Sequence, residues 1–153
     1  MKPVTVTRHI NAPVDRVEAL FKDLEHAADR VTSIKRIEML SEGPFGVGTR
    51  WRETREMFGG EATEELEVTE YVPGEHYVVE AESCGARYRS VFRFAPSGEG
   101  TDVTMEFGAE PVSFFAKLMS PLSGMMMKSV IKLIEQDMAD IARSAESAEQ
   151  RAT

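Results

Sequence analysis

Residues 49–72 read TRWRETREMFGGEATEELEVTEYV, and this stretch decides the fold class. Apolar and polar side chains alternate on both sides of Gly59-Gly60, which is the periodicity of two half-buried strands. A two-residue loop at Gly59-Gly60 predicts a hairpin in which apolar side chains meet one another and acid meets base. The opposed pairs are Met57 with Ala62, Arg55 with Glu64, Glu53 with Leu66, Trp51 with Val68 and, on the other face, Arg52 with Glu67.

The alternation continues beyond this hairpin. A second loop at Gly85-Ala86 predicts a second hairpin, because it again matches acid with base and apolar with apolar. Its pairs are Ser83 with Tyr88, Ala81 with Ser90, Val79 with Phe92, Tyr77 with Phe94 and, on the reverse face, Glu82 with Arg89. The predicted strands lie at about residues 4–10, 34–40, 49–58, 61–72, 76–84, 87–95 and 101–110. The Gly and Pro residues between them are typical of an antiparallel meander.

Helical periodicity occurs in two parts of the chain. Pro13 suits the first turn of a helix, where its missing N–H costs nothing. The apolar face that follows consists of Val14, Val17, Leu20, Phe21 and Leu24. Residues 24–30 are predicted to form a second short helix. A long helix is predicted over about residues 113–143, with a bend at Pro121, and the tail at about residues 144–153 is expected to fray.

Composition limits the classes of function. The chain has 153 residues, which fits one domain over residues 1–153 with a core large enough to fold without disulfides or metal. Its formal net charge of −8 argues against binding to nucleic acid or to an anionic membrane surface. No signal peptide is visible and no stretch approaches the ~20 apolar residues of a membrane span, so we expect a cytoplasmic protein with no membrane insertion. The single cysteine, Cys84, indicates a reducing compartment.

The predicted sheet has one apolar and one charged face, and the long helix must cover the apolar face. Small inner-face residues such as Ala62 and Ala81 would leave room between the sheet and the helix. Methionines are frequent in this helix, either as a surface that accommodates varied ligands or as ordinary core. The sequence therefore predicts a cavity of roughly 300–1,000 Å³. Its predicted lining is Trp51, Leu66, Tyr77, Val79, Tyr88, Ser90, Phe92, Met105, Phe107, Phe115, Met119, Leu122 and Met126.

Three charged side chains, Glu53, Arg55 and Glu64, fall on the same inner face. Charges there are costly unless they are paired or hydrated. Three interpretations stay open: a hydrated ion pair at the rim, groups that orient a polar part of a ligand, and acid–base catalysts with a raised carboxyl pKa. The arginines of the outer face alternate with glutamates, which predicts a solvated and charge-paired surface.

No motif in the chain indicates a metal or a cofactor. His9, His26 and His76 are scattered, and no second cysteine accompanies Cys84. The segment Gly46-Val47-Gly48 precedes a strand rather than a helix, so we interpret it as a turn and not as a dinucleotide loop. We therefore expect no metal and no cofactor. Separately, we expect the protein to be a monomer or a homodimer.

Four segments carry a family resemblance: INAPVDRV at residues 10–17, GVGTRW at 46–51, FRF at 92–94 and MSPLSG at 119–124. With them, about residues 3–145 resemble the START-related helix-grip superfamily (SRPBCC), and within it the polyketide cyclase/dehydrase-like branch. The resemblance implies an α+β helix-grip fold, in which a curved antiparallel sheet wraps around a long C-terminal helix, with one or two short helices after the first strand. It also implies a cavity for an apolar or amphipathic small molecule.

Three functions are compatible with this interpretation. The first is binding of an apolar or amphipathic molecule, lipid-like or polyketide-like. The second is a cyclase or dehydratase acting on a polyketide-like substrate, with Glu53, Arg55 and Glu64 as acid–base and orienting groups. The third is a protein-interaction module whose cavity or sheet edge accepts a partner chain. A buried glutamate with a pH–rate signature would favour the second, and a continuous exposed apolar patch would favour the third.

Overall fold

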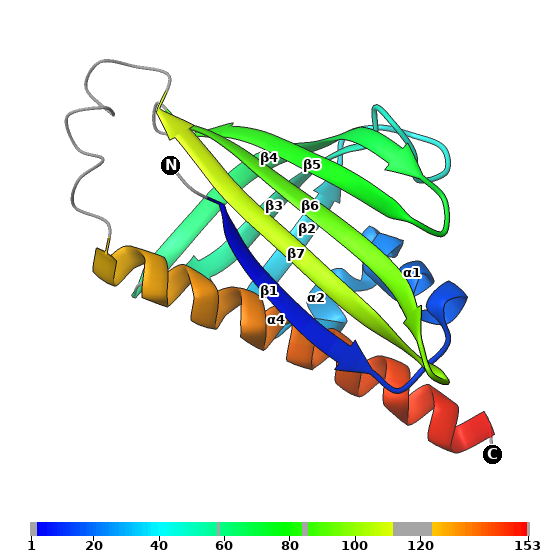
Figure 1. The fold of residues 1–153 in the computed structure, drawn as a ribbon. Helices are drawn as coiled ribbons and strands as arrows, with labels where there is room; N and C mark the ends of the chain where they lie inside the picture. The colour runs from blue at the N-terminus through cyan, green and yellow to red at the C-terminus, as the bar shows by residue number, and fades with distance from the viewer. Residues whose placement is uncertain (1–2, 58, 84–85, 112–123, 153) are drawn as a thin grey trace.

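The computed structural model describes residues 3–57, 59–83, 86–111 and 124–152 (Figure 1). Its strands are β1 (Val4–Ile10), β2 (Ile34–Met39), β3 (Arg50–Met57), β4 (Gly60–Val72), β5 (His76–Ser83), β6 (Ala86–Ser97) and β7 (Gly100–Pro111). Its helices are α1 (Val14–Lys22), the 3-10 turn η1 (Leu24–His26), α2 (Ala27–Arg30) and the long α4 (Gly124–Ala152). These bounds confirm the predicted strands and the short helices after the first of them.

The seven strands lie in the order β1-β7-β6-β5-β4-β3-β2, and all neighbours are antiparallel. The sheet is open, with β1 and β2 at its edges, and it curves around the side on which the helices lie (Figure 1). The helix α4 runs beside β1 and also contacts α1 and α2. This is the helix-grip arrangement that the sequence predicted.

Both hairpin registers differ from the predicted ones by two residues. Met57 pairs with Gly60 and Ser83 pairs with Ala86, so each turn lies one residue closer to the N-terminus than predicted. A shift of this kind leaves every side chain on its predicted face, so alternation alone cannot detect it. Gly59 has a φ of +81°, the left-handed conformation that tight turns ask of glycine. The observed pairs are Trp51 with Leu66, Glu53 with Glu64, Arg55 with Ala62, Arg52 with Glu65, Ala81 with Tyr88, Val79 with Ser90, Tyr77 with Phe92 and Glu82 with Arg87.

The C-terminal helix also differs from its prediction. It continues to Ala152, through the tail that was expected to fray after residue 143. The tail remains attached to the rest of the molecule, since Ala145 is fully buried and Glu146 accepts a hydrogen bond from the Asn11 N–H. The predicted bend at Pro121 lies outside the described residues.

One core lies between the sheet and the helices. Its buried members are Ile10, Ala12, Val17, Phe21, Trp51, Val68, Tyr77, Val79, Phe94, Val103, Ile134, Met138, Ala142 and Ala145. Two strands approach each other closely at Gly100, where an added Cβ would lie 2.6 Å from the carbonyl oxygen of Ile10. Glycine is therefore required for β7 to begin against the end of β1.

Candidate functional site

The inner face of the sheet has two parts that differ in burial. Three of the predicted lining residues, Trp51, Tyr77 and Val79, belong to the core and are at most 5% exposed. The others on the sheet are half-buried: Leu66, Tyr88, Ser90, Phe92, Met105 and Phe107. Of the predicted helix residues, Phe115, Met119 and Leu122 lie outside the described residues, and so does the side chain of Met126.

Aromatic rings cover much of this face. Tyr77 stacks on Phe92 with ring centroids 4.7 Å apart, and Tyr88 stacks on Phe107 at 5.8 Å. The Tyr77 hydroxyl donates a hydrogen bond to the carbonyl oxygen of Phe21 at 3.4 Å, and burial raises the pKa of this hydroxyl. Tyr77 is therefore a neutral core residue with its polar atom already used.

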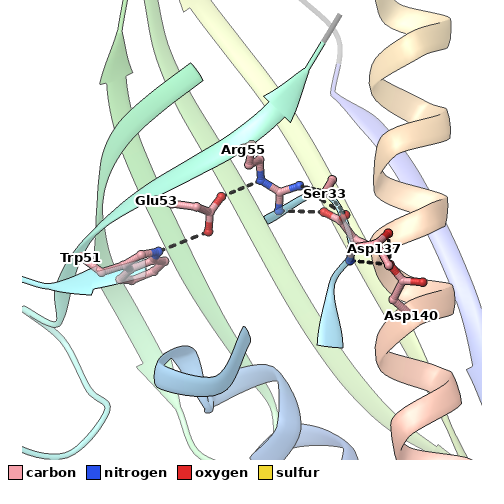
Figure 2. Close-up of polar contacts among 7 residues, drawn as sticks. Ser33, Trp51, Glu53, Arg55, Asp137 and Asp140 are labelled. Carbon is pink, nitrogen blue, oxygen red and sulfur yellow. Dashed lines mark hydrogen bonds and ion pairs between the residues drawn. The ribbon is translucent and has the colours of Figure 1, made fainter. Parts of the chain in front are cut away.

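A polar cluster lies where β3 meets α4 (Figure 2). At its centre is Arg55, whose Nε donates to Glu53 Oε2 at 2.6 Å and whose Nη2 lies 2.8 Å from Asp137 Oδ2. Its Nη1 donates to Ser33 Oγ at 2.9 Å and to Asp137 Oδ1 at 3.2 Å. The Trp51 indole N–H donates to Glu53 Oε1 at 3.4 Å. The side chains of Glu53, Arg55 and Asp137 are at most 20% exposed, so they form a shielded network and not a hydrated pair at the rim.

Two carboxylates in the same region of α4 bind Thr32 and Ser33, in the segment that precedes β2. The Ser33 hydroxyl donates to Asp137 Oδ1 at 3.1 Å. One turn further along the helix, Asp140 is 1% exposed and accepts hydrogen bonds from the Thr32 N–H and hydroxyl, both at 3.0 Å (Figure 2). Burial by itself raises the pKa of Asp140, but the hydrogen bonds from Thr32 and from two donors on α4 outweigh it and lower the pKa. Two helix carboxylates thus attach α4 to the sheet side of the molecule.

Glu53 and Arg55 were predicted from the sequence as members of this cluster, whereas Ser33 and Asp137 were not. Asp137 did carry a signal, because it lies three residues after Ile134. It therefore falls on the apolar stripe of the helix that includes Ile134, Met138 and Ile141. A charge on such a stripe needs a partner from the element that it faces. Ser33 carried no comparable signal, since its role depends on the path of the chain between α2 and β2.

The observed register changes the role of Glu64. It lies opposite Glu53, whereas the predicted partner Arg55 lies opposite Ala62. Glu64 is half-buried beside Leu66, and no residue that the structure describes donates a hydrogen bond to it or forms an ion pair with it. Burial, and then the charge of Glu53, raise the pKa of Glu64 against the opposing effect of Arg55. Such a carboxyl is able to give or accept a proton.

The guanidinium and its carboxylates perturb one another. Burial lowers the pKa of Arg55, but Glu53 and Asp137 outweigh it and hold this pKa above its ordinary value. Burial raises the pKa of Asp137 by more than the attraction of Arg55 lowers it. Two carboxylates therefore share one guanidinium, while its charge acts on the carboxyl of Glu64 without an ion pair between them, and the described residues contribute no second basic side chain in contact with the three.

Charged groups elsewhere follow the predicted pattern. The outer-face ion pairs join Arg50 to Glu65 and Glu67, Arg52 to Glu38 and Glu65, Arg87 to Glu82, Arg89 to Glu70 and Arg93 to Glu106. Within the described ranges, no group of His, Cys, Asp and Glu side chains is arranged to hold a metal ion. No helix in the described part of the chain has the length and apolar character needed to cross a bilayer.

Solved structures of other proteins share this fold, among them the following three. A protein from Thermus thermophilus superposes with a TM-score of 0.77 at 24% identity, over 95% of this chain and 98% of that chain. A START superfamily protein from Mycobacterium smegmatis gives 0.70 at 19% identity over 100% of both chains. The Zhui aromatase/cyclase from a Streptomyces species gives 0.76 at 16% identity, over 95% of this chain and 93% of that chain.

The sequence matches a family model over nearly its whole length, while none of the curated proteins matches it. The model covers residues 1–146 and is described as polyketide cyclase/dehydrase and lipid transport. Its extent includes every described strand and most of α4. The chain therefore belongs to the polyketide cyclase/dehydrase and lipid transport family.

Proposed function

We propose that this protein binds an apolar or amphipathic small molecule between the inner face of the sheet and α4. The observation that carries the proposal is a border between apolar and charged side chains on that face. Trp51 pairs with Leu66, and two residues further along the same strands Glu53 pairs with Glu64. A site for an amphipathic molecule needs such a border, because the apolar body and the polar group of the ligand must both be accommodated.

Half-buried side chains form the apolar lining in this proposal. Leu66, Phe92, Met105 and Phe107 share the inner face with the core but are incompletely covered. Covering such side chains with a ligand gains about 25 cal/mol per Å² of apolar surface. Membership of a family whose description includes lipid transport and polyketide cyclases supports the same class of ligand.

A substitution that fills the proposed space tests the proposal. Ser90 is a small inner-face residue, with Val79 and Phe107 as its partners on the neighbouring strands. Ser90→Phe is expected to abolish binding of a neutral hydrophobic dye while the protein keeps its thermal midpoint. Thr5→Phe places a similar ring at an exposed position on β1 and should bind the dye normally. Undiminished dye binding by Ser90→Phe contradicts the proposal, as does the loss of about 1–3 kcal/mol that marks an overpacked core.

Native mass spectrometry can identify the ligand. Freshly purified protein is expected to carry a mass excess that disappears on unfolding, and the released molecule can then be identified. Ser90→Phe should be purified without this excess, which separates a molecule held on the inner face from one that adheres elsewhere.

A second candidate is a cyclase or dehydratase, and the observation that favours it is the carboxyl of Glu64, which has no partner among the described residues. In a dehydration, protonated Glu64 gives its proton to the departing hydroxyl as the C–O bond breaks. Its carboxylate then takes the neighbouring α-proton as the double bond forms, so that water is the one product lost. Glu53 and Arg55 act as positioning residues in this scheme, since their polar atoms already bind one another and Asp137.

Glu64→Gln separates binding from catalysis. If Glu64 is the acid, turnover of a β-hydroxyketone substrate should fall by about 10²–10⁴-fold while dye binding is retained. Glu65→Gln removes the same charge from the outer face of the same strand and should turn over normally. Equal rates in the wild type and in Glu64→Gln would leave binding as the function.

A further inference from the structure

We infer that the inner-face site selects its ligand by charge: it accepts an amphipathic molecule whose polar group is cationic or neutral, and it rejects one that ends in a carboxylate or a phosphate. The inference rests on the proposed function, because it assigns a chemical class of ligand to that same site. The polar end of the site, where Glu64 borders Leu66, is the part that selects by charge.

The first observation is the balance of charge at this end. Glu53 and Asp137 bind one guanidinium, that of Arg55, and Glu64 lies opposite Glu53 on the next strand. The described residues bring no other basic side chain into contact with these three carboxyl groups. Three carboxylates and one guanidinium amount to 3 − 1 = 2 net negative charges when all are ionised. Water screens these charges poorly, because Glu53, Arg55 and Asp137 are at most 20% exposed. An anionic ligand group is therefore repelled, and a cationic one is attracted.

The second observation is that Arg55 has no nitrogen without a partner. Its Nε binds Glu53, its Nη1 binds Ser33 and Asp137, and its Nη2 binds Asp137. The contact with Asp137 involves both carboxylate oxygens, which is the geometry that a ligand carboxylate or phosphate would itself use. An anion could take this place only by displacing a carboxylate of the protein, which would then remain shielded and unpaired.

The third observation is that Glu64 is left to meet the ligand. Its carboxyl is half-buried on the inner face, and no residue in the described ranges pairs with it. An ionised Glu64 pairs with an ammonium group, whereas a protonated Glu64 donates a hydrogen bond to a carbonyl or hydroxyl oxygen. Neither form compensates for the burial of a second anion beside it.

Another cation on the helix side, Lys22, is already paired. Its Nζ lies 3.1 Å from Glu18 Oε1 and donates to the Tyr71 hydroxyl at 2.7 Å. Glu18, which is 6% exposed, also accepts the Gly74 N–H at 2.8 Å. This second cluster holds α1 against the β4–β5 turn and offers no unpaired positive charge to an anionic ligand.

Three amphipaths of equal chain length separate charge from hydrophobicity. Decylamine, decanol and decanoic acid are used to displace the neutral dye N-phenyl-1-naphthylamine at neutral pH. We expect decylamine to act at about tenfold lower concentration than decanoic acid, with decanol between them. Glu64→Gln should reduce this ratio by severalfold. Glu65→Gln, which changes the net charge by the same amount on the outer face, should leave the ratio unchanged.

The pH dependence gives a second readout. The charged groups that act on Glu64 are Glu53 and Arg55, both from β3. The preference for decylamine over decanol, neither of which titrates in the carboxyl range, should increase as pH rises through the pKa of Glu64, because the carboxylate form attracts an ammonium. In Glu64→Gln this increase should be absent.

Three results would overturn the inference. One is decanoic acid displacing the dye as well as decylamine does. Another is a preference for decylamine that Glu64→Gln leaves intact, or that Glu65→Gln reduces as much as Glu64→Gln does. Either outcome would mean that the preference comes from the general charge of the protein and not from Glu64. The third is failure of the dye and of decanol to bind at all, which removes the proposed function and the inference together.

Discussion

Two sets of arginine–carboxylate pairs in this protein share their chemistry and differ in their surroundings. On the outer face, Arg50 and Arg89 are 49% and 50% exposed, and their glutamate partners are equally accessible. On the inner face, Arg55 is 19% exposed, with Glu53 at 14% and Asp137 at 20%. Water and salt screen the exposed pairs, whereas a shielded charge that loses its partner cannot be rehydrated cheaply. Burial, and not residue type, therefore decides which ion pair matters for stability.

The largest effect is expected from removal of the shielded guanidinium. Arg55→Ala leaves Glu53 and Asp137 without their counter-charge and should lower the free energy of unfolding by about 3–5 kcal/mol. The double variant with Asp137→Ala should recover part of this loss, because one stranded carboxylate is then gone. Urea melts of the wild type, both single variants and the double variant measure this coupling. A small, additive and salt-sensitive loss would place the inner cluster in the same class as the outer pairs.

The buried carboxylate of Asp140 adds a third case, because it accepts from the neutral donors of Thr32 and Gln136 as well as from the exposed Arg143. Asp140→Ala removes the acceptor of the Thr32 N–H and should cost about 1.5–3 kcal/mol at neutral pH. The folded-state pKa of Asp140 is lowered, so its stabilisation is present above the unfolded pKa of about 3.9 and is lost as pH falls through the folded pKa. The free energies of unfolding of the wild type and of Asp140→Ala, measured by urea melts, should therefore become equal in acid. The control Glu135→Ala changes an exposed residue of the same helix, and a loss as large as that of Asp140→Ala would contradict the assignment.

Glu64 is the inner-face charge without a partner among the described residues, and removing its charge should stabilise the protein. Its folded-state pKa is raised, so ionisation destabilises the fold increasingly as pH rises from the unfolded pKa of about 4.3 through the folded pKa. At pH values above these two pKa values, Glu64→Gln should have a higher midpoint of thermal unfolding than the wild type. In acid, the two midpoints should be equal. The expected gain is smaller than the loss in Asp140→Ala. An equal gain in Glu65→Gln would attribute the effect to net charge.

The smallest effect is expected on the outer face. Arg89 pairs with Glu70 at 2.9 Å, and both side chains are at least 50% exposed. Arg89→Ala should cost less than about 1 kcal/mol, and this loss should shrink as salt is added. Denaturant melts at low and high salt check this expectation. A salt-independent loss comparable to that of Arg55→Ala would remove the distinction between the two faces.

The sheet could be predicted from the sequence because its signal is local. Alternation depends on the parity of positions along one strand, so Trp51, Val79 and Phe94 could be assigned to the inner face without knowledge of their neighbours. The same parity placed Glu53 and Arg55 on that face, and the structure confirms both placements through their mutual bond and their shielding.

The partners within the site could not be predicted in the same way. Register depends on the position of the turn, and moving the loop by one residue changed the partner of Arg55 from Glu64 to Ala62 without changing any face. Asp137 is separated from Arg55 by 82 residues, and no periodicity within one element relates the two. The sequence analysis therefore paired the right arginine with the wrong carboxylate.

By itself the sequence determined the composition of each face, the succession of strands and helices, and family membership, because each depends on short-range patterns or on motifs read in order. Only the tertiary structure decided which carboxylates neutralise Arg55 and which one remains unpaired within the described ranges. Those contacts join β3, α4 and the segment before β2, and their energies depend on distance and burial. Both quantities exist only once the sheet has curved around the helix.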